Sequence, residues 1–147
     1  MKALVNKIVS SNEGLDTLAI RVAAGVIFAA HGAQKLFGWF GGYGLEGTAG
    51  WMSSIGIEPA YLMTMLAGSA EFFGGLFLIV GLLVRPASLV LGVTMVVAIV
   101  AVHLENGLFM SNNGYEFGLA LLAISVSLAF RGAGSFGLDQ QLATKLR

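Results

Sequence analysis

Six polar side chains could act together in the outer half of the predicted membrane-spanning helices. They come from three segments predicted below to be helices, or directly follow one of them: His31, Gln34, Lys35, His103, Glu105 and Glu116. Histidine and lysine can donate hydrogen bonds to the carbonyl oxygens of a quinone ring, and a carboxylate can accept its protons. The group therefore predicts a binding site for a quinone head group, formed by His31, Gln34, Lys35, His103 and Glu116.

Other interpretations of the same group stay open. His31, His103 and Glu116 supply the imidazole and carboxylate donors of a divalent metal site. The two histidines alone would suit a haem with two axial imidazoles. The group could also be a buried polar network that only fixes how the helices pack. The sequence indicates no catalytic residue and no firmly held cofactor, and quinone is the candidate ligand.

Glu71 lies near the middle of the most apolar stretch, residues 60–84. A helix of that length crosses the ~30 Å hydrocarbon core of a membrane. An unpaired carboxylate there costs at least about 2.5 kcal/mol, so the acid needs a partner. Counting helical rises predicts a buried ion pair between Glu71 and Arg21. Lys35 is expected to extend toward the opposite membrane interface, unless it joins the quinone site.

The composition defines the class of protein. Of 147 residues, 56% are hydrophobic and only 11% are charged, which is typical of an integral membrane protein. The zero net charge gives no support for nucleic-acid binding, and the absence of cysteine excludes thiolate metal sites and dithiol catalysis. The sequence predicts a single all-α domain over residues 1–147, a bundle of four transmembrane helices. Their approximate bounds are 17–36, 60–84, 86–104 and 116–131, with loops at 38–59 and 105–115 and a polar tail after 131.

The basic residues are distributed unevenly about these predicted helices. Only Lys35 falls on one side of the membrane, and the other seven fall on the opposite side: Lys2, Lys7, Arg21, Arg85, Arg131, Lys145 and Arg147. Cytoplasmic segments of membrane proteins carry the excess of lysine and arginine. Both termini are therefore expected to be cytoplasmic.

A weak internal repeat relates the two halves of the chain. Glu71-Phe72 followed by Arg85 is echoed by Glu116-Phe117 followed by Arg131. Each preceding helix also carries one histidine toward its outer end. The pattern suggests two repeats of two helices in parallel orientation.

Together these motifs resemble the DoxX family of small four-helix bacterial membrane proteins. The residues that carry the resemblance are His31-Gly32-Ala33-Gln34-Lys35-Leu36-Phe37-Gly38, Glu71-Phe72-Phe73-Gly74-Gly75, Gly81, Arg85, His103 and Glu116-Phe117. The family takes its name from the membrane subunit of a thiosulfate:quinone oxidoreductase. The resemblance implies a multi-pass protein of the bacterial inner (plasma) membrane, acting as an accessory or quinone-interacting subunit of an oxidoreductase complex. A non-catalytic scaffold or assembly factor is the alternative, followed by a pathway for a small solute or protons. Besides the lipid bilayer, a redox partner protein or a second copy of the chain could be its partner.

Overall fold

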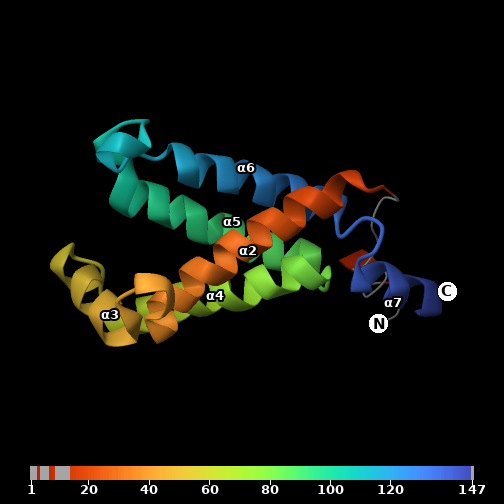
Figure 1. Ribbon diagram of the computed structural model, residues 1–147, viewed down its shortest axis with the longest axis horizontal. Helices are drawn as coiled ribbons and strands as arrows, with labels where there is room; N and C mark the ends of the chain where they lie inside the picture. Colours follow the sequence, from red (N-terminus) through yellow and green to blue (C-terminus); the bar gives the residue numbers. More distant parts are fainter. Residues whose placement is uncertain (1–2, 4–6, 9–13, 147) are drawn as a thin grey trace.

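The protein is described by a computed structural model, in which residues 3, 7–8 and 14–146 are placed. Within those residues the chain is helical and contains no strand (Figure 1). In chain order the elements are α2 (Asp16–Phe37), η1 (Trp39–Gly41), α3 (Gly44–Ser54), α4 (Ala60–Val80), α5 (Val84–Ala98), η2 (Ile99–His103), η3 (Leu104–Asn106), η4 (Met110–Asn112), α6 (Glu116–Arg131) and α7 (Leu138–Leu146).

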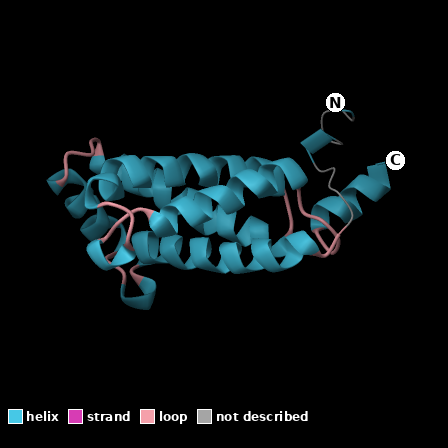
Figure 2. Cartoon of the chain, turned by 90° about the horizontal axis from the view of Figure 1, so that it is seen from above, coloured by secondary structure: helices cyan, strands magenta, loops and turns pink. Residues whose placement is uncertain are grey.

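The helices α2, α4, α5 and α6 pack along one another. The loops lie toward the two ends of the molecule (Figure 2). α2 packs mainly on α4, and α5 packs mainly on α6. Among the described residues, three helical segments are long and apolar enough to cross a membrane: Asp16–Phe37, Ala60–Val80 and Val84–Asn106. α6 is shorter, with 16 residues. The chain is thus an all-helical membrane protein with several apolar spans.

Glycines set the register between α2 and α4. A Cβ atom added to Gly32 would lie 2.3 Å from the backbone nitrogen of Phe72, and one added to Gly75 would lie 2.4 Å from that of Ala29. The two backbones touch at these points, which leaves no room for a side chain. Small residues permit such close contact between membrane helices. This contact brings the beginning of α2 beside the end of α4, and the end of α2 beside the middle of α4.

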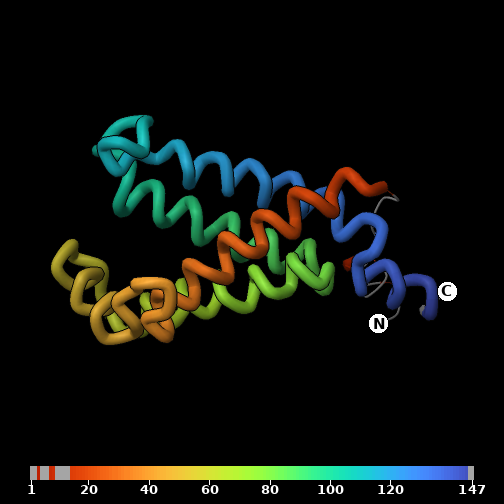
Figure 3. The backbone as a smooth tube through the Cα atoms, in the orientation of Figure 1, coloured from red at the N-terminus to blue at the C-terminus, as the bar shows by residue number. Residues whose placement is uncertain are grey.

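The predicted loop at 38–59 is wrong in part, because it contains α3. Three glycines lower the helical propensity of this segment, but Ala49 and Met52 are buried against Ala60 at the start of α4. This burial of apolar side chains stabilises a helix that propensity alone does not favour. α3 covers one end of the molecule (Figure 3).

The opposite end is closed by α7, where the sequence predicted only a polar tail. Asp139 of α7 is 1% exposed, and its carboxylate accepts hydrogen bonds from the N–H groups of Leu83 (2.7 Å) and Val84 (2.9 Å). These two groups begin α5, so Asp139 caps that helix from a distant part of the chain. α5 consequently begins at Val84 and not at Pro86, and the proline fits in its first turn because N–H groups there have no helical partner.

Candidate functional site

An ion pair joins α2 to α4 inside the protein. The Lys35 Nζ donates to the Glu71 Oε2 at 2.5 Å, and the two side chains are 24% and 4% exposed. The prediction that Lys35 extends to the membrane interface is therefore wrong, because Lys35 turns inward to the acid. Lys35 follows Gly32 by about one turn of α2, and Gly32 lies against Gly68 and Phe72, so the ammonium group comes level with Glu71.

The predicted ion pair between Arg21 and Glu71 is not formed. The guanidinium group of Arg21 donates instead to three backbone carbonyls, those of Ala133 (2.9 Å), Leu78 (2.9 Å) and Ile79 (2.6 Å). The register explains the error. Arg21 lies beside Gly81, about ten residues and about 15 Å of helix from Glu71, which is beyond the reach of its side chain.

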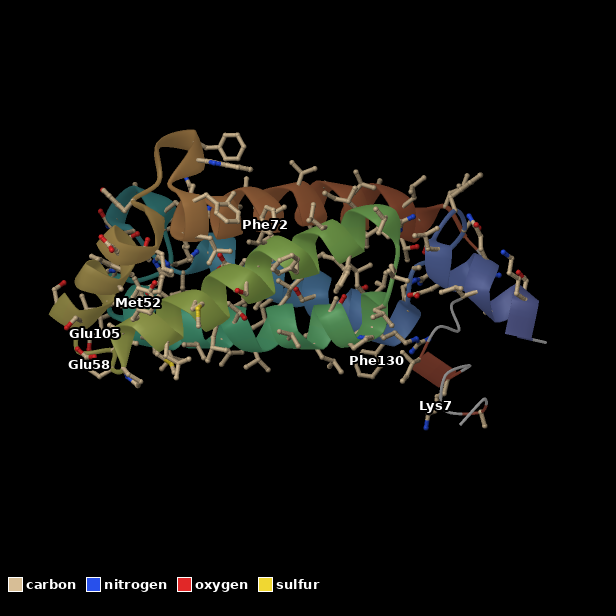
Figure 4. The ribbon with its side chains drawn as sticks, turned by 90° about the horizontal axis from the view of Figure 1, so that it is seen from below. Lys7, Met52, Glu58, Phe72, Glu105 and Phe130 are labelled. Carbon is tan, nitrogen blue, oxygen red and sulfur yellow. The ribbon has the colours of Figure 1, made fainter. Side chains whose placement is uncertain are left out.

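A cavity of about 570 Å³ opens beside the Lys35–Glu71 pair. α2, α3, α4 and α5 with η2 contribute to it, and most of its lining residues are apolar or glycine. The two helix pairs diverge toward the end that carries α3 (Figure 1), and Figure 4 labels Met52, a lining residue of α3, at this end. The site-forming residues predicted from the sequence that line this cavity are Gln34, Lys35 and His103.

A second cavity of about 310 Å³ also borders this pair. His31, Met95 and Phe117 line only this one, whereas Lys35, Glu71 and His103 line both. The Lys35–Glu71 pair therefore borders two cavities. A pair in this position can exchange hydrogen bonds, or protons, with a molecule in either of them.

In both histidines the Nδ1 atom is hydrogen-bonded to a backbone carbonyl. The Nδ1 of His31 bonds to the carbonyl of Ile27 at 2.9 Å, and the Nδ1 of His103 bonds to that of Asn113 at 2.8 Å. A carbonyl oxygen can only accept, so each Nδ1 carries a proton, and the Nε2 of such a ring is an acceptor when the ring is neutral and a donor when it is charged. His103 ends the π-helix Ile99–His103, a wider turn that changes which side chains face inward and is common at functional sites.

Glu116 is not part of the cavity lining. Its Oε1 accepts a hydrogen bond of 2.7 Å from the N–H group of Met110, so it orders the loop before α6. Within the described part of the chain, no three histidine, cysteine, aspartate or glutamate side chains are grouped so that they could hold a metal ion. The alternative metal site of His31, His103 and Glu116 is therefore not assembled.

Sequence reasoning missed Glu71 as a member of the site and missed α3 as one of its walls. A signal for Glu71 was present, because an acid in the middle of an apolar span faces a functional or packed interior. Identifying Lys35 as its partner required the register of α2 on α4. The contribution of α3 had no clear signal in a segment so rich in glycine.

The helices are apolar, and a buried ion pair borders two cavities among them. These features define a membrane protein with an internal polar site. The sequence profile of the DoxX family matches residues 17–104, which include all of α2 except its first residue, all of α4, and His103. The chain belongs to the DoxX family, as its motifs indicated.

Curated relatives resemble the chain over most of its length. A Bacillus subtilis protein named "Putative oxidoreductase CatD" is 34% identical over 125 residues, 85% of each chain. An uncharacterized protein of Haemophilus influenzae is 30% identical over 86% of this chain and 90% of its own. An uncharacterized membrane protein of Mycobacterium tuberculosis is 29% identical over 88% and 83% of the two chains. No solved structure matches the chain significantly.

Proposed function

We propose that the protein binds the head group of a membrane quinone, oxidised or reduced, in the cavity of about 570 Å³ beside Lys35 and Glu71. The observation that carries this proposal is a buried ion pair at the edge of a mainly apolar cavity. Ligand sites of this size combine apolar walls with a few polar groups that orient the ligand. A quinone has the same division, with a flat apolar ring and polar oxygens on it.

Each polar residue of the cavity has a role in this proposal. Lys35 donates a hydrogen bond to one ring oxygen, because its ammonium group has N–H groups beyond the one that Glu71 accepts. Glu71 and His103 take up or release the protons that accompany a change in the redox state of the ring. The isoprenoid tail leaves along apolar side chains of α5 and η2, such as Val97 and Ala101.

The protein would act as a quinone-interacting subunit of an oxidoreductase complex in the bacterial inner membrane. The name of the Bacillus subtilis relative supports a redox link. Because the chain has no cysteine, electrons would come from a bound cofactor or from a partner protein that carries one. The site residues do not select thiosulfate as the substrate of that partner.

We extend the proposal to four membrane spans, with α6 as the fourth. α6 packs along α5, and α2 packs along α4, which also supports two copies of a two-helix repeat. One end of the molecule holds Arg21, Arg85 and α7. There Arg21 donates to the carbonyl of Ala133, and the charge of Asp139 on α7 interacts with both arginines. Lys35 lies toward the other end. A reporter fused after Leu146 should be located in the cytoplasm, and a reporter fused at Gly47 should be located outside it. A cytoplasmic signal at Gly47 would exclude this topology.

Calorimetric titration of the purified protein with a short-chain quinone tests the proposed function. Lys35→Met removes the donor at the cavity and should weaken binding at least ten-fold. Glu105→Gln changes an exposed charge at the same end of the molecule that lines neither cavity, and it should bind as the wild type does (Figure 4). Equal affinity in all three proteins, or no binding by the wild type, would refute the proposal.

A scaffold or assembly factor is the second candidate. It is favoured by the Lys35–Glu71 pair, which ties α2 to α4 whether or not a ligand is bound. A scaffold would co-purify with a client protein, would contain no quinone and would keep its client when Lys35 is replaced by Met. The proposed function requires instead that the purified protein bind quinone, and that Lys35→Met weaken this binding.

A further inference from the structure

The second cavity, of about 310 Å³, brings several polar side chains together. They are His31, Lys35, Glu71, His103 and Asn113. Another cavity, between α5 and α6, has nearly the same volume, about 300 Å³, but its lining is apolar residues and glycine apart from two serines. Cavities with several polar partners hold water, whereas apolar cavities stay dry. The two cavities should therefore differ in their contents.

Three polar atoms of the residues that line the second cavity have no partner among the described residues. The Glu71 carboxylate bonds to Lys35 through its Oε2, which leaves Oε1. His31 and His103 each bond to a backbone carbonyl through Nδ1, which leaves Nε2. An unsatisfied polar atom is most costly where it is buried, and Glu71 is only 3% exposed. Water both donates and accepts, so it can satisfy all three atoms whether the histidines are neutral or charged.

The second cavity extends to the surface at the end covered by α3. Two of its lining residues, Met110 and Asn113, are exposed and belong to the loop before α6. This loop and α3 lie at the same end of the molecule (Figure 3). Glu71, on α4, lines the same cavity from inside the protein. The cavity therefore leads from a surface loop to the buried carboxylate.

We infer that the second cavity is a water-filled passage, which connects the Lys35–Glu71 pair to the aqueous phase at the α3 end. A proton that Glu71 releases passes to water in the passage, and a proton that it takes up comes from there. The passage does not require a bound quinone. Where the larger cavity holds a quinone, the passage gives its protons a separate route to the α3 side of the membrane.

The reaction of silver ions with single cysteines tests this inference. The chain has no native cysteine, so each introduced thiol is the only one present. Met95→Cys on α5 and Leu121→Cys on α6 place it at two positions that line the second cavity but neither of the others. The thiolate is the reactive form, and it forms in water but not in a dry apolar site. Silver ions are small and do not cross lipid, so they report water that is continuous with one side.

Two control cysteines lie inside the protein away from the passage. Leu91→Cys is one turn from Met95 on α5, at a residue that is 0% exposed and lines none of the three cavities. Ser125→Cys changes only one atom of the side chain and lines the apolar cavity. Asn112→Cys, on the exposed loop, shows which side of a sealed vesicle carries the α3 end.

Silver added on the α3 side of sealed vesicles should block Met95→Cys and Leu121→Cys about ten-fold faster than the two internal controls. The blocked fraction is measured as lost labelling by a fluorescent maleimide after denaturation. Rates equal to those of the controls, or faster reaction from the α7 side, would overturn the inference. If one of the two cysteine variants does not fold, the other decides. No quinone is present, so failure of the proposed function would not affect the result.

His31 lines the second cavity but not the larger one, so its replacement tests whether the polar lining admits the water. In the Met95→Cys protein, His31→Phe keeps a planar ring without its polar atoms and should slow the silver reaction at least three-fold. His31→Gln keeps polar atoms at this position and should preserve the rate. Equal rates in the two variants would also overturn the inference, because the polar lining would not be what holds the water.

Discussion

The two ends of the protein bury charged side chains in different ways. At the end closed by α7, Arg21 is 1% exposed and its guanidinium group is bonded to three carbonyls, while Asp139 accepts from two N–H groups. At the end covered by α3, Lys35 and Glu71 bond to each other once and border two cavities. The charged groups at the α7 end are hydrogen-bonded to the backbone. Those at the α3 end bond to each other and line the cavities.

This difference separates a structural role from a binding role. Arg21 joins the end of α4 to the segment before α7, and Asp139 holds the start of α5, including Leu83 in a left-handed conformation (φ 49°) that is unfavourable for leucine. Such contacts stabilise the fold, and the two side chains are each 1% exposed, which keeps them from a ligand. We expect the largest loss of stability from a change at the α7 end, and a change in ligand affinity only from changes at the α3 end.

Replacing Arg21 should have the largest effect. Arg21→Leu removes the hydrogen bonds of a buried guanidinium group to three carbonyls and should lower the free energy of unfolding by about 3–5 kcal/mol. Lys145→Gln, an exposed change on α7, is the control and should alter it by less than about 0.5 kcal/mol. Urea unfolding followed by circular dichroism in micelles measures both. Quinone affinity per folded molecule should not change in either variant, and a parallel loss of affinity would contradict the separation of the two ends.

The partner of Glu71 can be identified by double-mutant cycles. Glu71→Leu strands the Lys35 charge and should cost about 2–3 kcal/mol, and the additional change Lys35→Met should recover part of it, with a coupling energy of about 1–3 kcal/mol. The same cycle with Arg21→Leu should be additive within about 0.5 kcal/mol, because these residues do not touch. Coupling to Arg21, and none to Lys35, would restore the pairing expected from the sequence.

Asp139 should have a smaller effect on stability than Arg21. Asp139→Ala removes the cap of α5, which should lower the free energy of unfolding by about 1–2 kcal/mol. The amide protons of Leu83 and Val84 should then exchange with solvent faster, as seen by hydrogen–deuterium exchange mass spectrometry. Unchanged exchange at these two positions would show that the carboxylate does not cap the helix.

The smallest predicted effect is a pH dependence from the same residue. Burial raises the pKa of the Asp139 carboxyl, although its hydrogen bonds from Val84 and Leu83 and the nearby arginine charges act in the opposite direction. A raised pKa means that the folded state binds the proton more tightly than the unfolded state. The contribution of Asp139 is therefore most favourable at low pH, and it declines as the pH rises from about 4 through the raised pKa.

Comparison with Asp139→Asn isolates this contribution, because the variant has no proton to lose. The difference in unfolding free energy, wild type minus variant, should fall as the pH rises through that interval. A difference that rises instead would mean that the hydrogen bonds and arginines outweigh burial.

Much of this arrangement could be predicted from the sequence, but the partners of the charges could not. The helical, membrane-spanning character follows from long apolar runs, and the importance of Glu71 follows from its position within one. The pairing with Lys35 depends on where Gly32 and Gly75 let two helices touch, and this tertiary register has no signature in the spacing along one helix. Asp139 capping α5 is a contact over more than fifty residues, so local patterns could not reveal it.

The most direct measurement of the central claim is photoaffinity labelling with an azido-quinone, mapped by mass spectrometry. The competing location is an apolar cavity of about 300 Å³ between α5 and α6, which is lined by Gly92 and Ser125 and by neither residue of the ion pair. Labelled peptides are expected from the end of α2, from α3 and from η2. Excess unlabelled quinone should suppress the label, and Lys35→Met should strongly reduce it. Label confined to α5 and α6 around Gly92 and Ser125, or label that excess quinone does not displace, would contradict this claim.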